Sequence, residues 1–172
     1  MEFYDLIESR ESIRDYNPNK KIPKDVLLRI VNAGRIAPSA SNKQPWRFIL
    51  VSSPQKLEEV HECYHREWFK NSPHVLIVVG DKSKSWKRSY DGFDSIETDM
   101  AIAMDHIILA AENEGVGACW IIAYDYNILA QAIQLNENEE LYCITPLGYQ
   151  NPGFKKRGNK IRKSMDEILE MI

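Results

Sequence analysis

The sequence predicts one α/β or α+β domain built around a small sheet. Three observations support this prediction: apolar residues recur at helical spacing in several segments, short apolar runs are rich in β-branched residues, and the two kinds of segment alternate along the chain. The chain has 172 residues, 44% of them hydrophobic and 27% charged, which is enough for one substantial core. It contains no internal repeat and no low-complexity stretch.

The first two helices are expected from apolar spacing. Residues 3–7 place apolar side chains on one face of a short amphipathic helix. Pro23 suits a first helical position, and the apolar residues that follow it at helical spacing predict a helix that ends near Gly34 or Pro38.

Two strands with a helix between them are expected next. The apolar run 48–51 predicts a strand, and Ser53 followed by Pro54 suits the start of a polar helix that continues to about Arg66. The run 75–79 is apolar and largely β-branched, which is typical of a strand buried on both faces.

The middle of the chain predicts a long loop and a long helix. Residues 81–95 are polar and irregular, and loops of that length in compact domains often carry function. Residues 96–114 predict a helix whose middle is apolar nearly all round, so we expect it to be buried within the domain or at a subunit interface. Gly115 and Gly117 end this helix.

The last third of the chain carries two capping signals. Asp125 is suited to the N-cap of a helix, and Ser164 with Glu167 forms a capping-box pattern. The expected elements are a strand over 118–122, a helix from 125 to 135, a strand over 141–147 that ends at Gly148, an extended segment over 149–163, and a final short helix.

Composition excludes several classes of protein. The net charge of −3 argues against general nucleic-acid binding, which needs a broad basic face. No window approaches the ~18 uninterrupted apolar residues of a membrane span, and the acidic N-terminus lacks the apolar core of a signal peptide. Cys63, Cys119 and Cys143 are odd in number and far apart, which indicates reduced thiols. We therefore expect a soluble, cytoplasmic protein.

Basic clusters lie near both ends of the chain. Arg10, Ser12 and Arg14 occur at every second residue, so in extended backbone their side chains point to one side. Lys160 and Arg162 repeat this spacing near the C-terminus. Such groups suit a phosphate or another compact anion, and there is no GxGxxG turn to hold it instead. We expect the two clusters to close around one anionic ligand.

A third polar cluster runs from Pro38 to Trp46. Pro38 and Pro45 stiffen a loop of short polar side chains. Such a loop can bring amides and hydroxyls to the edge of a flat heteroaromatic ring.

Taken together, these motifs resemble the FMN-dependent nitroreductase family in its short form. Each motif alone is weak, but their order and spacing match the family over nearly the whole chain. The matching pieces are Arg10-x-Ser12-x-Arg14, Ala37-Pro38-Ser39-x-x-Asn42-x-Gln44-Pro45-Trp46, Gly115-x-Gly117-x-x-Trp120-Ile121, Pro146-Leu147-Gly148-Tyr149 and Lys160-x-Arg162.

The resemblance implies an α+β, three-layer fold with a small central mixed sheet, a long buried central helix and an intertwined homodimer. It implies a single domain over 1–172, whose C-terminal segment from about 149 to 172 wraps the partner subunit. It also implies two FMN sites at the subunit interface. The residues it assigns to FMN are Arg10, Ser12, Arg14, Lys160 and Arg162 at the phosphate, Pro38, Ser39, Ala40, Ser41, Asn42 and Gln44 of the other subunit along the ring, and the backbone of Ile122 and Ala123 near flavin N5.

The activity that the resemblance implies is an NAD(P)H oxidoreductase that reduces nitroaromatics, quinones or a related small acceptor by ping-pong hydride transfer. NADH or NADPH is the implied electron donor. No catalytic side chain is required, because the flavin carries the chemistry, and Arg14 is the candidate for tuning its electronics. The alternative is a flavin-binding protein for storage or sensing with little turnover. We expect no nucleic-acid or membrane partner.

Two other interpretations compete with these assignments. Arg10 and Arg14 could be surface residues that pair with Asp5, Glu11 or Asp15.

The string from His61 to His65 matches the HExxH zinc-protease motif, because a helix places two histidines four residues apart on one face. Its charged neighbours indicate a solvated helix, and the only downstream candidates for a third ligand are Glu97 and Asp99. We therefore expect no metal site.

Overall fold

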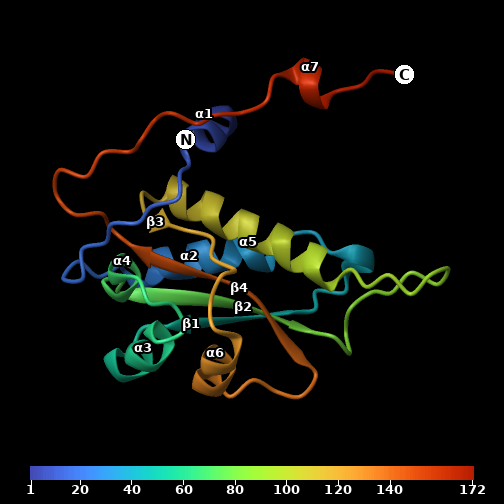
Figure 1. The fold of residues 1–172 in the computed structure, drawn as a ribbon, viewed down its shortest axis with the longest axis horizontal. Coiled ribbons are helices and arrows are strands. Elements are labelled where there is room, and N and C mark those ends of the chain that lie inside the picture. The colour runs from blue at the N-terminus through green and yellow to red at the C-terminus, as the bar shows by residue number, and fades with distance from the viewer.

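The computed structural model describes residues 1–172 and contains one four-stranded sheet with helices on both faces (Figure 1). The elements in chain order are α1 (Phe3–Ser9), α2 (Lys24–Arg35), a 3₁₀ turn (Ala40–Asn42), β1 (Trp46–Val51), α3 (Pro54–His61), α4 (Glu67–Lys70), β2 (His74–Asp81), α5 (Ile96–Asn113), β3 (Gly117–Ala118), α6 (Tyr126–Ile133), β4 (Glu139–Gly148) and α7 (Met165–Ile168).

The sheet has the strand order β1-β2-β4-β3, and all its pairings are antiparallel. It therefore differs from the mixed sheet that the resemblance implied. Val51 at the end of β1 pairs with Val75 at the start of β2. The connection through α3 and α4 thus leaves and re-enters the sheet at the same end, and needs no crossover of the kind that joins parallel strands.

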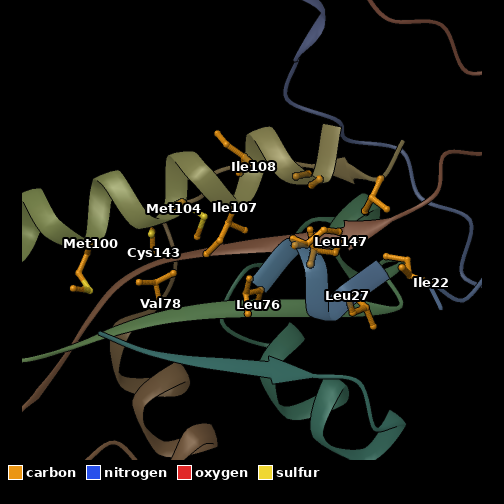
Figure 2. Packing of buried hydrophobic residues seen from close by; sticks show 14 of the residues in the cluster. Ile22, Leu27, Leu76, Val78, Met100, Met104, Ile107, Ile108, Cys143 and Leu147 are labelled. Atoms are coloured by element: carbon orange, nitrogen blue, oxygen red, sulfur yellow. The ribbon is translucent and has the colours of Figure 1, made fainter. Parts of the chain in front are cut away.

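The central strand β2 supplies both hydrophobic clusters, because successive side chains of a strand face opposite sides. Leu76 and Val78 pack against α2 and α5, and Figure 2 shows Met100, Met104 and Ile107 of α5 pointing toward β2 and β4. Ile77 and Val79 face the other cluster, which α3, α4 and α6 cover. The expected three-layer α+β fold and the strand buried on both faces are confirmed.

Most expected elements form, with boundaries shifted by a few residues. Asp125 caps α6 by accepting a hydrogen bond from the Ile128 amide at 3.1 Å. The capping box of Ser164 and Glu167 is present at α7. The strand expected over 118–122 is reduced to β3 and a single bridge between Ile121 and Ile144.

A proline and a hydroxyl interrupt that strand. The register places Cys119 opposite Pro146, which has no amide to donate, and the Cys119 amide itself donates to Thr145 Oγ1 at 3.1 Å.

The polar helix expected to reach Arg66 ends at His61 instead. The Cys63 carbonyl accepts the Asp125 amide at 2.7 Å, so this part of the chain bonds to the start of α6 and does not continue α3. His61 is buried and packs edge-on to Phe69, whereas His65 lies beyond the helix end and is exposed. The two histidines therefore do not share a helix face, and no group of three or more His, Cys, Asp or Glu side chains is placed to hold a metal ion.

Both ends of the chain lie outside the three layers. The segment after β4 is extended, as expected, and runs beside α1 (Figure 1). Large apolar side chains are exposed on both segments, namely Phe3, Tyr4, Ile161, Met165, Ile168, Leu169, Met171 and Ile172. None of the helices combines the length and apolar composition that a membrane crossing requires.

The long helix α5 is buried on one face only. Met100, Met104 and Ile107 enter the core between α5 and the sheet. Ile102 and Leu109 lie elsewhere on the helix and are only partly covered. One chain therefore leaves part of the apolar surface of α5 open.

Candidate functional site

The segment that carries the first basic cluster is an extended strap between α1 and α2. Its backbone is fixed at two places: the Ile13 amide donates to the Ala118 carbonyl at 2.9 Å, and the Asn17 amide donates to the Tyr149 carbonyl at 2.8 Å. Ile13 is buried, while Ser12 and Arg14 on either side of it are exposed. The extended backbone therefore turns the polar side chains outward, as their alternation predicts.

Glu11 and Lys160 join the strap region to the C-terminal segment. The Glu11 carboxylate accepts the amides of Arg157 and Gly158 at 2.9 and 2.8 Å. The bond from the Gly158 amide is the main reason that the pKa of Glu11 lies below its usual value. Lys160 Nζ donates to the carbonyls of Ile7 and Glu8 at the end of α1. The two ends of the chain thus meet within one subunit.

The meeting of these segments creates an anion hollow. We use this name for the cavity of about 400 Å³ lined by Arg10, Glu11, Ser12, Arg14, Arg157, Asn159, Lys160, Ile161 and Arg162. All five residues that the sequence assigned to a phosphate lie on its wall.

The four predicted cations of the anion hollow have no carboxylate partner. Arg10, Arg14, Lys160 and Arg162 take part in no salt bridge. Burial and the neighbouring charges of Arg10 and Arg162 lower the pKa of Lys160. A bound anion would relieve this crowding of like charges.

Two of the three carboxylates proposed as surface partners are engaged elsewhere, and the third, Asp5, forms no salt bridge. Glu11 accepts the two backbone amides, and Asp15 accepts Asn151 Nδ2 at 2.5 Å. The interpretation of Arg10 and Arg14 as ordinary surface ion-pairing residues is therefore wrong.

The segment after Cys119 leads from the anion hollow toward a second, apolar cavity. Cys119 lies buried near Arg14, and burial raises the pKa of its thiol while the Arg14 charge opposes that shift. Ile121 is fixed by reciprocal amide–carbonyl bonds to Ile144 at 2.9 and 3.0 Å. Ile122 and Ala123 then leave the sheet and are exposed. Ile122 lines a cavity of about 280 Å³ that Gly80, Ile96, Glu97, Met100, Glu140, Leu141 and Tyr142 complete.

The loop from Pro38 to Gln44 lies far from the anion hollow of the same chain. Its Ala40 amide donates to Asp99 in the first turn of α5, at 2.8 Å. The hollow lies near the other end of α5, where Lys156 and Ser9 both bind Glu112. Asp99 and Glu112 are separated by about 20 Å along the helix axis at the usual rise per residue. One chain therefore does not bring Pro38, Ser39, Ala40, Ser41, Asn42 and Gln44 to the predicted phosphate site.

Sequence reasoning missed two residues that organise these regions. Glu11 was considered only as a surface partner, yet it links the two chain ends. Asp99 was considered as a third ligand for the HExxH string and as a possible flavin contact of the middle region, but was left out of the predicted site, yet it anchors the loop. No local pattern reveals either role, because the partners are 146 and 59 residues away.

Comparison with known proteins identifies the family. Residues 7–71 and 55–149 match the model of the Nitroreductase family. The chain is 31% identical over 160 residues to a protein of Methanothermobacter thermautotrophicus provisionally named an NADH dehydrogenase/NAD(P)H nitroreductase, a match that covers 89% of this chain and 81% of that protein.

Solved structures show the same fold. A nitroreductase family protein from Clostridium difficile 630 superposes with a TM-score of 0.88 at 29% identity, covering 99% of this chain and 98% of that one. A Staphylococcus epidermidis protein provisionally named an NAD(P)H:FMN oxidoreductase has a TM-score of 0.85, covers 99% of this chain and 96% of its own, and at 20% identity shares the fold alone. The chain belongs to the nitroreductase family.

Proposed function

We propose that this nitroreductase-type oxidoreductase is an FMN-dependent enzyme that uses NADH or NADPH. The observation that carries the proposal is the convergence of four unpaired cations from both chain ends on one hollow. Arginine forks bind phosphate oxygens bidentately, and a phosphate monoester carries close to two negative charges at neutral pH. The donor set therefore fits the phosphate of FMN, with Arg10, Ser12, Arg14, Lys160 and Arg162 as the residues that hold it.

The ring of FMN fits beside the segment that leaves the anion hollow. Ile122 and Ala123 are exposed where this segment departs from the sheet, so their backbone groups are open to a ligand. In this proposal they approach flavin N5, and Arg14 adds positive charge near the bound cofactor. Ile122 is 69% exposed and leaves less room than a small residue at the same place.

A second copy of the chain would complete the site. The Pro38–Gln44 loop and the anion hollow lie near opposite ends of α5, so a two-fold axis that sets two α5 helices antiparallel brings the loop of one subunit to the hollow of the other. The exposed apolar side chains of α1 and the C-terminal segment, and the open surface of α5, are suited to such a contact. We propose a homodimer in which residues 149–172 wrap the partner.

In this proposal the side chains bind and orient the reactants. When bound, FMN supplies two-electron transfer between the nicotinamide donor and the acceptor. Donor and acceptor use the same open face in turn, which predicts ping-pong kinetics. The acceptor is a small molecule such as a nitroaromatic or a quinone. Cys63, Cys119 and Cys143 are free and buried, which suits the reducing cytoplasm that we propose as the location.

The test is an absorbance spectrum of the protein reconstituted with FMN, followed by anaerobic addition of NADH and, separately, of NADPH. We expect either nucleotide to bleach the visible flavin bands and a nitroaromatic or quinone to restore them. A protein that takes up no FMN would contradict the proposal. Bound FMN that neither nucleotide bleaches would favour the alternative, a flavin-binding protein for storage or sensing.

A further inference from the structure

The Pro38–Gln44 loop has an unusual backbone. Ser41, Asn42 and Gln44 have φ values of 49°, 53° and 48°, in the left-handed region that residues other than glycine seldom adopt. Three such residues close together persist only where the surroundings hold them, and they concentrate at functional sites. The hydrogen bonds that hold this loop in its strained shape therefore point to residues that support a functional site.

Few interactions fix the loop to the rest of the chain. Ser39 closes it internally, because its carbonyl accepts the Asn42 amide at 3.0 Å and its Oγ accepts the Gln44 amide at 2.9 Å. The 3₁₀ turn inside the loop contains no buried residue, so core packing does not fix its position. From within the loop, the Ala40 amide donates outward to Asp99 Oδ1 at 2.8 Å. Just after the loop, the Pro45 carbonyl accepts the Asp81 amide at 2.7 Å.

Asp99 is built into the start of α5. Its side chain is almost fully buried, with 1% of the residue exposed. One carboxylate oxygen accepts the Ser95 hydroxyl at 2.9 Å, and the other accepts the Ala40 amide. The first turn of a helix favours a negative charge, and hydrogen bonds to a charged acceptor are stronger than neutral ones. One carboxylate thus joins the rigid helix to an otherwise exposed loop.

We propose that Asp99 is a positioning residue of the flavin site. Through the Ala40 amide it fixes the Pro38–Gln44 loop in the shape in which the loop lines the ring of FMN bound by the partner subunit. This inference rests on the proposed function and adds a residue to it. The hydrogen bond from Ser95 holds the Asp99 carboxylate at the start of α5, whereas the hydrogen bond from the Ala40 amide holds the loop to that carboxylate.

The test compares four variants that separate the two bonds of Asp99. Asp99→Ala removes both bonds, and Ala40→Pro removes only the loop donor at a position where the first residue of a helical turn tolerates proline. Asp99→Asn keeps a carbonyl that can accept the Ala40 amide. Ser95→Ala removes only the helix-side bond. Far-UV circular dichroism selects the variants that fold.

The first readout is the affinity of the apo-protein for FMN, measured by quenching of flavin fluorescence. We expect Asp99→Ala and Ala40→Pro to weaken binding about 10-fold or more, the effect of losing a buried charge-assisted hydrogen bond. Asp99→Asn and Ser95→Ala should remain within about 3-fold of the wild type, because each keeps the loop bond. Visible circular dichroism of the bound flavin should change in Asp99→Ala and Ala40→Pro but not in Asp99→Asn or Ser95→Ala.

The second readout needs no cofactor. Lys43 is exposed within the loop, and a loosened loop should be cut by trypsin at Lys43 faster in Asp99→Ala and Ala40→Pro than in Ser95→Ala. Equal affinities, equal flavin spectra and equal cleavage across the four variants would overturn the role of Asp99. A wild-type protein that takes up no FMN would instead overturn the proposed function, and the Asp99 role in a flavin site with it.

Discussion

The two regions near the ends of α5 are organised in opposite ways. Near the C-terminal end, the anion hollow consists of unpaired charges on extended segments that meet within one chain. At the N-terminal end, the Pro38–Gln44 loop carries little charge but is held in a rare backbone shape by the buried Asp99. The comparison shows that one chain brings the residues of the anion hollow together but keeps the Pro38–Gln44 loop away from them. In the proposed homodimer, the loop of the second chain completes the site.

The largest expected effect comes from emptying the anion hollow of its arginines. The double variant Arg10→Ala/Arg14→Ala should weaken FMN binding by about 100-fold or more, because each charge-assisted hydrogen bond contributes about 1.5–3 kcal/mol. Fluorescence titration of the apo-protein measures this. The control Lys56→Ala/Lys70→Ala removes two cations of α3 and α4 that already pair with Glu59 and Glu62. Undiminished FMN affinity in the arginine variant would contradict the claim that the anion hollow binds the phosphate.

Substitution of Glu11 tests whether the anion hollow binds FMN through the positions of its cations or only through its net charge. If the hollow acted only through its total charge, Glu11→Ala would tighten binding of an anion. We expect the opposite, a loss of about 10-fold, because the variant frees the Arg157 and Gly158 amides and with them the segment that carries Lys160 and Arg162. Glu11→Gln should fall between this variant and the wild type. Tighter FMN binding by Glu11→Ala would show that the link does not position the C-terminal cations.

The smallest effect is expected at His61, which belongs to neither half of the proposed site. Burial lowers its pKa from 6.5 to about 4, so the unfolded chain takes up a proton in that interval and the folded chain does not. The free energy of unfolding therefore falls as the pH drops from 6.5 to 4.

Replacing His61 with Leu should remove about 1–2 kcal/mol of that acid sensitivity. Urea unfolding at several pH values measures it, with His65→Leu, at an exposed position, as the control. FMN affinity and zinc content should be unchanged. Loss of bound zinc from the His61 variant would revive the metal-site interpretation of the HExxH string.

Local sequence patterns predicted the elements that local forces determine. The apolar spacing of α2 and α5, the cap at Asp125 and the capping box at Ser164 all concern residues a few positions apart. The alternation of Arg10, Ser12 and Arg14 likewise predicted an outward-facing basic row.

Features that depend on distant partners could not be predicted from local patterns. Beyond the end of α3 the Cys63 carbonyl accepts the Asp125 amide, and β3 is short where Cys119 meets Pro146 and the Thr145 hydroxyl. The role of Asp99 depends on an amide 59 residues away. At each of these places the local sequence is compatible with more than one structure, and a contact with a distant residue determines which one forms.

The central claim is that each proposed site combines the anion hollow of one subunit with the Pro38–Gln44 loop of the other. The most direct measurement mixes Arg10→Ala/Arg14→Ala chains with Asp99→Ala chains, refolds them together in equal amounts and titrates tight FMN sites. In a homodimer with shared sites, every mixed dimer carries one site with both defects and one with none, so about a quarter of the wild-type sites should return. If both halves belonged to one subunit, mixing would restore no tight sites, and the account would be contradicted.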